Sequence, residues 1–193
     1  MNKNRLEAFS DGVLAIIITI MVLEFKVPNS VSYEAIVPLL HKFLSYVLSF
    51  IYVGIYWNNH HHMMHTVKKV NGKILWANLH LLFWLSLIPF ATAWIGEHKF
   101  APFPMMFYGF ILLMNGLAYF ILQNLILSHH GKDSLLSKAL GKDYKGKSSP
   151  ILYLIAMLCA YKFPSIAGGI YIFVALMWLI PDKRIERIFN END

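Results

Sequence analysis

Long apolar runs separated by short polar connections dominate the pattern of this chain. A helix needs about 20 mostly apolar residues to cross the hydrocarbon core of a bilayer. Four runs approach or exceed that length, at residues 9–25, 36–63, 74–95 and 104–127. Two shorter runs follow at 150–161 and 166–180, and their length would also suit a re-entrant pair. The pattern predicts six membrane-spanning helices, the last two being the shortest.

The longest polar segment, residues 128–149, divides the predicted helices into two groups. A four-helix part covers 1–127, and a C-terminal helical hairpin covers 150–181. No internal repeat is visible, and no polar stretch is long enough for an added soluble domain. We therefore expect one six-helix transmembrane domain over 1–193, with 128–149 as a cytoplasmic linker.

Composition excludes two classes of protein that the length alone would allow. Apolar residues make up 57% of the chain and charged residues 15%, against about 45–50% and about 25% in soluble domains. Too little polar surface remains to cover a soluble globule. Cys159 is the only cysteine, so a disulfide scaffold is excluded as well. The expected fold class is an all-α integral membrane protein.

Basic residues are distributed unevenly between the two sides that six spans define. The side of the N-terminus carries thirteen of them: Lys3, Arg5, Lys68, Lys69, Lys73, Lys132, Lys138, Lys142, Lys145, Lys147, Lys183, Arg184 and Arg187. The other side carries four: Lys26, Lys42, Lys99 and Lys162. Because cytoplasmic loops are enriched in Lys and Arg, both termini are predicted to be cytoplasmic. The net charge of +6 is explained by these basic segments, which set the orientation of the helices beside anionic lipid. No nucleic-acid partner is therefore expected.

The first helix has two contrasting faces. At about 100° per residue, Ile16, Ile20 and Leu23 fall within about 60° of one another, and Thr19 flanks them. Asp11 points about 140° away, toward the expected body of the subunit. The aliphatic stripe continues toward the N-terminus through Gly12, Phe9 and Arg5. Such a stripe suits lipid or core packing as well as the wall of a pore, and periodicity alone leaves both open.

Two separated blocks of residues carry a resemblance to a known family. The first block is Arg5-x-x-x-Phe9-Ser10-Asp11, continued by Thr19 and by Leu23-Glu24-x-Lys26-Val27-Pro28. The second block is Tyr56-Trp57-x-x-His60-His61, followed by Trp76-x-Asn78 and Pro89-Phe90. Together they resemble the prokaryotic branch of the transmembrane protein 175 family, whose members are potassium-permeable channels. The resemblance covers about residues 5–95.

The resemblance implies an architecture and a function. It implies a homotetramer of six-helix subunits in a prokaryotic plasma membrane, with the first helices around a central pore and no P-loop filter. By the family pattern Ile16 forms the narrowest hydrophobic ring, and Ile20 and Leu23 form further layers. Thr19 supplies the hydroxyl associated with potassium preference. The implied permeant ions are K⁺ and, more weakly, other monovalent cations; no cofactor or enzymatic activity is implied.

A polar network is expected where the first three helices meet at the cytoplasmic interface. A buried carboxylate needs hydrogen-bond donors, because an unpaired one is costly away from water. Asp11 and Ser10 lie on the first helix, and suitable partners lie at the end of the second and the start of the third. The predicted network comprises Arg5, Phe9, Ser10, Asp11, Trp57, His60, His61, Trp76 and Asn78.

Two other functions remain open from the residues alone. A proton-coupled carrier could use Asp11 and the histidines as proton relays. A metal or haem protein could use His61 and His65, whose i, i+4 spacing places them on one helix face. No Cys, Asp or Glu lies near these histidines in the sequence to complete a tetrahedral set, so we assign no metal site.

Overall fold

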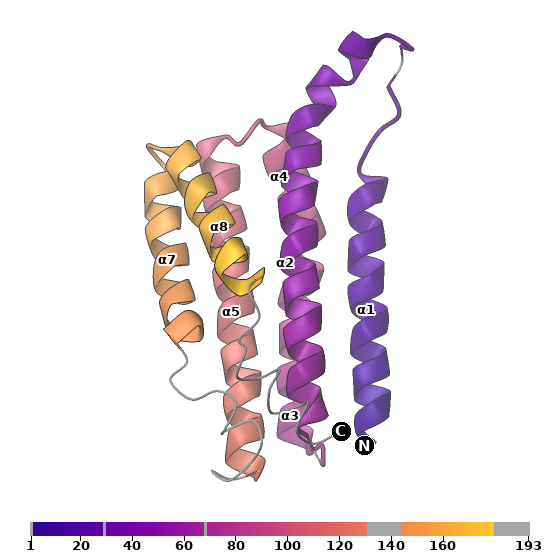
Figure 1. Ribbon diagram of the computed structural model, residues 1–193, viewed down its shortest axis with the longest axis vertical. Coiled ribbons are helices and arrows are strands. Elements are labelled where there is room, and N and C mark those ends of the chain that lie inside the picture. Colours follow the sequence, from indigo (N-terminus) through magenta and orange to yellow (C-terminus); the bar gives the residue numbers. More distant parts are fainter. Residues whose placement is uncertain (1, 29, 68, 131–143, 180–193) are drawn as a thin grey trace.

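The part of the chain that the computed structural model describes is helical in every element (Figure 1). The described residues are 2–28, 30–67, 69–130 and 144–179. Most of the predicted linker, residues 131–143, and the predicted end of the hairpin at 180–181 lie outside them, as does Lys68.

Seven α-helices and two 3₁₀ turns make up these described residues. In chain order they are α1 (Lys3–Leu23), η1 (Tyr33–Ala35), η2 (Val37–Leu39), α2 (Leu40–His65), α3 (Gly72–Ser86), α4 (Ile88–Glu97), α5 (Pro102–His130), α7 (Tyr144–Ala160) and α8 (Pro164–Leu179). The Asn2 side chain caps α1 by accepting a hydrogen bond from the Asn4 backbone N–H at 3.1 Å.

Within the described residues, four segments are long and apolar enough to cross a membrane: Lys3–Leu23, Tyr33–His65, Gly72–Glu97 and Pro102–His129. They correspond to the four long runs of the sequence pattern. α8 is apolar but shorter, with 16 residues. α7 begins at Tyr144 rather than at Pro150, so Pro150 lies inside a helix instead of at its start.

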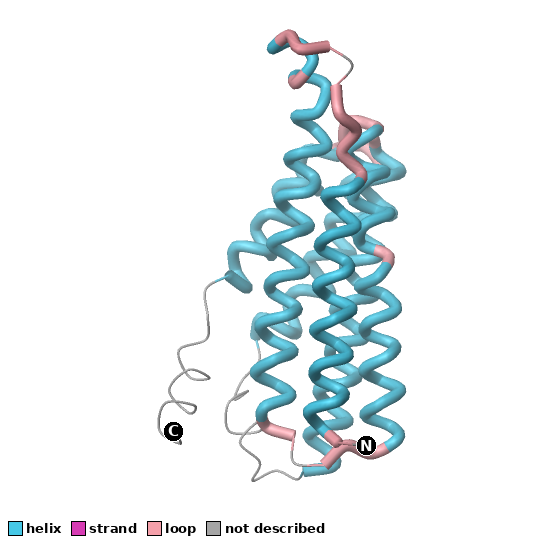
Figure 2. The backbone as a smooth tube through the Cα atoms, turned by 90° about the vertical axis from the view of Figure 1, so that its right-hand side faces the viewer, coloured by secondary structure: helices cyan, strands magenta, loops and turns pink. Residues whose placement is uncertain are grey.

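The third segment differs from the single helix expected over 74–95. It consists of α3 and α4, which are separated at Leu87, and Figure 2 shows this break as a short loop-coloured piece half-way along the bundle. Pro89 in the first turn of α4 explains the break. A proline has no backbone N–H to donate, and its ring clashes with the carbonyl one turn earlier.

The long helices stand side by side along the longest axis of the molecule, with connections at its two ends (Figures 1 and 2). The N-terminus, the α2–α3 connection and the end of α5 lie at one end, whereas the α1–α2, α4–α5 and α7–α8 connections lie at the other. α7 and α8 flank α5 on the side of the bundle away from α1, and α1 forms its opposite edge. α1 packs against α2, α3 and α4.

A buried polar cluster links the middle of α2 to α4 and α5. The Thr92 hydroxyl donates to the Ser49 oxygen at 2.6 Å, and the Ser49 and Tyr108 hydroxyls lie 2.9 Å apart. All three side chains are buried. Hydrogen bonds between helices in a membrane contribute about 1 kcal/mol each, so this cluster helps to hold the scaffold against which α1 packs.

Replacing Gly109 of α5 by alanine is expected to loosen the α5–α8 contact. A Cβ atom at this position would collide with the hydroxyl of Tyr171, which is buried and donates to the Met105 carbonyl at 3.0 Å. Overpacking of this kind costs about 1–3 kcal/mol. Thermal unfolding of the purified protein in detergent should show a lower midpoint. Gly169→Ala is the matched control, because a Cβ there meets nothing within 4 Å; equal midpoints for the two variants would contradict the prediction.

Candidate functional site: the exposed face of α1 and its polar anchor

The aliphatic stripe of α1 lies on the face that the helix turns away from its own protomer. The exposed fractions of Ile16, Ile20 and Leu23 are 58%, 42% and 78%, and Thr19 between them is also exposed. The hydroxyl of Thr19 donates to the Ile16 carbonyl at 2.9 Å. Its oxygen lone pairs are not used in that bond, so they remain able to meet a cation.

The opposite face of α1 is buried against the rest of the protomer. Its buried residues recur every three or four positions: Leu6, Ser10, Leu14, Ile17 and Met21. This spacing is that of one helical face. Burial and exposure therefore alternate around α1 as the two-face interpretation of the sequence requires, and the protomer itself covers only one side of the helix.

Three buried side chains from three helices form a directed chain of hydrogen bonds. His60 Nε2 on α2 lies 2.7 Å from Asn78 Oδ1 on α3, and Asn78 Nδ2 donates to Ser10 Oγ on α1 at 2.9 Å. Ser10 in turn donates to the Leu6 carbonyl at 2.9 Å. Because an amide oxygen only accepts, the proton of neutral His60 is on Nε2. This chain ties the buried face of α1 to α2 and α3.

Asp11 is held separately, at the edge of the same region. The indole N–H of Trp57 donates to Asp11 Oδ1 at 3.1 Å. Asp11 is half-buried and Trp57 remains about half exposed. The Trp57 ring also stacks on His61, with ring centroids 6.4 Å apart and 24° between their planes. The carboxylate is therefore paired with one donor at the α1–α2 contact rather than enclosed in the buried chain.

Trp76 points away from this network within the protomer, so its part in the network stays a prediction. Its side chain is 73% exposed. The reason is geometric: Trp76 precedes Asn78 by two residues, which is about 200° around α3, so an inward Asn78 turns Trp76 outward. Arg5 and Phe9 are exposed as well, on the same face of α1 as Ile16.

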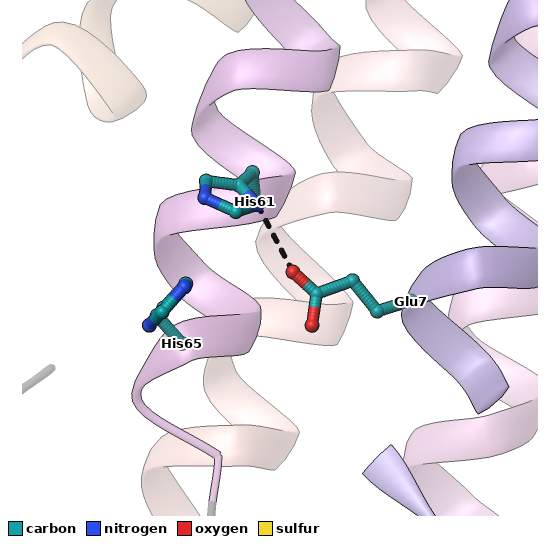
Figure 3. Close-up of side chains that lie close together, drawn as sticks. All are labelled: Glu7, His61 and His65. Carbon is teal, nitrogen blue, oxygen red and sulfur yellow. Dashed lines mark ion pairs between the residues drawn. The ribbon is translucent and has the colours of Figure 1, made fainter. Parts of the chain in front are cut away.

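Glu7 is the residue that the sequence interpretation missed. Its Oε1 lies 3.0 Å from His61 Nδ1, and its side chain is only 17% exposed. Figure 3 shows the carboxylate of α1 turned toward His61 and His65 on α2. The expectation that no acid lies near these histidines is thereby corrected. Helical spacing could have found Glu7, because it precedes Ser10 by three residues and Asp11 by four.

A groove runs between α1 and α4 beside the exposed stripe. Ile16 and Ile20 form part of its α1 wall, and Phe90 and Trp94 form part of its α4 wall. Toward the α4–α5 connection it is lined by Glu97, which forms an ion pair with Lys42 of α2. The groove is thus mostly apolar along its length and charged at one end.

Comparisons with known proteins agree with the resemblance read from the two blocks of residues. Residues 5–89 match the sequence profile of the family described as "Endosomal/lysosomal potassium channel TMEM175". A potassium channel of Chryseobacterium sp. (strain P1-3) is 58% identical over 192 residues, which cover 100% of both chains. A potassium channel of Streptomyces collinus is 37% identical over 103 residues, which cover 51% of this chain and 50% of that one.

A solved structure matches most of the chain. It is the crystal structure of a lysosomal potassium-selective channel TMEM175 homolog from Chamaesiphon minutus, with a TM-score of 0.79 and 27% sequence identity. The match covers 92% of this chain and 96% of that chain. At 92% of the chain, the likeness reaches well beyond residue 89, where the match to the family profile ends. With a relative that is 58% identical from end to end, this chain is a prokaryotic member of the TMEM175 potassium channel family.

Proposed function

We propose that this protein is a membrane channel that conducts K⁺ passively through a pore lined by α1. The observation that carries the proposal is the exposed aliphatic stripe of α1 with Thr19 inside it, in a protein whose relatives are named potassium channels. Among the residues that the structure describes, this stripe stays largely exposed. In a pore shared between subunits, this exposed stripe would form the lining.

The pore requires several copies of the chain, and we propose a homotetramer. One helix cannot enclose a conduit, and closed cyclic symmetry is the usual arrangement of identical subunits. The groove between α1 and α4 lies directly beside the stripe, because Ile16 and Ile20 belong to both. An adjacent subunit seated against the α4 wall of this groove would cover the apolar side chains of Phe90 and Trp94 and leave the stripe facing the axis.

Within the pore, Ile16, Ile20 and Leu23 would form successive hydrophobic layers. Seven residues separate the first layer from the last, which is about 10 Å along a helix. Hydrophobic constrictions of this kind restrict ion flow by excluding water. Since side chains without oxygen atoms replace hydration poorly, selectivity would rest on the ring of Thr19 hydroxyls and would be modest for K⁺ over other monovalent cations.

The proposed location is the plasma membrane of a prokaryote, with both termini in the cytoplasm. The basic residues near the N-terminus, the α2–α3 connection and the start of α7 support this orientation. α7 and α8 would complete six helical crossings as two short segments in contact with lipid and with α5.

Potassium flux from liposomes that contain the purified protein is the direct test. Liposomes with the protein should release K⁺ down its gradient without an energy source, and at a rate that does not saturate as a carrier would. A proton-coupled carrier would instead require a pH gradient, and a histidine-ligated haem protein would show a visible absorption band. Membership of a channel family does not favour either alternative.

Thr19→Ala is expected to lower the preference for K⁺ over Na⁺ several-fold. The hydroxyl is the one oxygen that side chains contribute between Ile16 and Leu23, and an oxygen replaces part of the hydration of an ion. The reversal potential under opposing K⁺ and Na⁺ gradients measures the effect. Thr19→Ser keeps the hydroxyl and should keep the preference. An unchanged reversal potential in Thr19→Ala would remove this role from residue 19.

A further inference from the structure

Two histidines of α2 and one glutamate of α1 form a cluster that the channel function does not use. The side-chain ligand atoms of Glu7, His61 and His65 all lie within 4.8 Å of one another. Figure 3 shows the three side chains converging from the two helices. We propose that they bind a transition-metal ion of the Zn²⁺ class and that the ion bridges α1 to α2.

The chemistry of the donor set selects this class of ion. Two imidazoles and one carboxylate are ligands that Zn²⁺ accepts, whereas Mg²⁺ and Ca²⁺ favour sets made of oxygens. Three protein ligands leave one position for water. Zn²⁺ lies about 2.0–2.2 Å from nitrogen and oxygen ligands, so tetrahedral ligand atoms stand about 3.4 Å apart. Glu7 Oε1 and His61 Nδ1 are already 3.0 Å apart, and the ligand atom of His65 lies within 4.8 Å of both.

The surroundings of the cluster favour a defined geometry. The Trp57 ring stacks on His61, and the His61 and His65 rings meet edge to face with centroids 4.8 Å apart. Lys3 Nζ donates to the backbone carbonyl of His65 at 3.3 Å, which joins the start of α1 to the end of α2. The ligands therefore come from two helix ends that are held together before any ion binds. This lowers the loss of conformational entropy on binding.

The site would hold the first turns of α1 to the end of α2. Its relevance to conduction rests on the proposed function, in which α1 lines the pore, but the binding itself does not. An ion that binds the folded protein raises its stability by mass action. Metal binding and unfolding can both be measured in detergent without any flux, so failure of this proposal and failure of the channel proposal are separable.

Zinc binding to the purified protein, freed of any polyhistidine tag and stripped with EDTA, is the test. Equilibrium dialysis against ZnCl₂, followed by metal analysis, should give one high-affinity Zn²⁺ per subunit that excess Mg²⁺ does not displace. Glu7→Gln and His65→Gln should each lower the affinity at least about tenfold. His62→Gln is the matched control, because it removes a neighbouring histidine that is outside the cluster, and its affinity should equal that of the wild type.

Thermal unfolding supplies an independent readout. Zn²⁺ should raise the unfolding midpoint of the wild type and of His62→Gln, and should raise that of His65→Gln by clearly less at the same Zn²⁺ concentration. His65 is exposed, so this variant is expected to fold even if Glu7→Gln does not. The proposal is overturned if the wild type binds no Zn²⁺, if His65→Gln binds it as the wild type does, or if His62→Gln loses it equally.

Discussion

Replacing Ile16 by alanine should raise potassium flux at least about tenfold. In the proposed pore four Ile16 side chains form the narrowest apolar ring, and the barrier to an ion there is the cost of losing its hydration. Truncation to alanine widens the ring and lets water accompany the ion. A tenfold increase in flux corresponds to a free-energy barrier to ion passage that is lower by about 1.4 kcal/mol. This is a small part of the barrier that a constriction without water presents to an ion. Potassium efflux from liposomes, normalised to the incorporated protein, measures it.

Val22→Ala is the matched control for that experiment. Val22 is an exposed aliphatic residue of the same helix, but it lies about 120° around α1 from Ile16. Its truncation removes apolar surface without touching the stripe, so flux should stay at the wild-type rate. Equal flux from the wild type and Ile16→Ala would place the constriction elsewhere. An equal increase in both variants would mean that the apolar surface of α1 acts generally rather than through one ring.

The two faces of α1 could be predicted because they depend only on spacing along one helix. Ile16 and Ile17 are chemically alike, yet one is exposed and the other is buried, and a rotation of 100° per residue accounts for the difference. Partners on other helices are harder to predict, because they depend on crossing angles and relative depth. The structure places Asn78 beside Ser10, to which its amide donates. Trp76, two residues earlier, faces outward from the protomer, because an inward Asn78 turns it about 200° away.

Hydropathy marks the depth of the bilayer more reliably than it marks the ends of helices. Apolar residues continue across Leu87, so the pattern shows no sign of the break between α3 and α4. The sequence feature that marks the break is Pro89. Its missing N–H interrupts the backbone hydrogen bonding of the helix but leaves the hydropathy of the segment unchanged. Conversely, α7 begins in the polar segment at Tyr144, where hydropathy predicts a linker. Polar residues can form the first turns of a helix wherever they extend beyond the apolar layer.

Asn78→Leu should destabilise the protomer more than any substitution on the exposed face of α1. Asn78 is fully buried and bonds to two other helices at once: it accepts from His60 on α2 and donates to Ser10 on α1. Leucine keeps the bulk but offers neither group. A buried polar group left unsatisfied costs about 1–3 kcal/mol. We expect a loss of about 2–4 kcal/mol in the free energy of unfolding.

Most of this loss in the free energy of unfolding should come from His60, which would be left without a hydrogen-bond partner. Ser10 retains its bond to the Leu6 carbonyl, whereas Nδ1 of His60 has no partner among the described residues and Nε2 would lose its own. Thermal unfolding in detergent, followed by tryptophan fluorescence, should show a clearly lower midpoint for Asn78→Leu. Trp76→Leu, on the same helix but exposed, should unfold near the wild-type temperature. A reversed order would mean that the contact of α1 with the scaffold is held by the indole of Trp76 and not by the buried amide, and the anchor assigned to the pore helix would have to be moved.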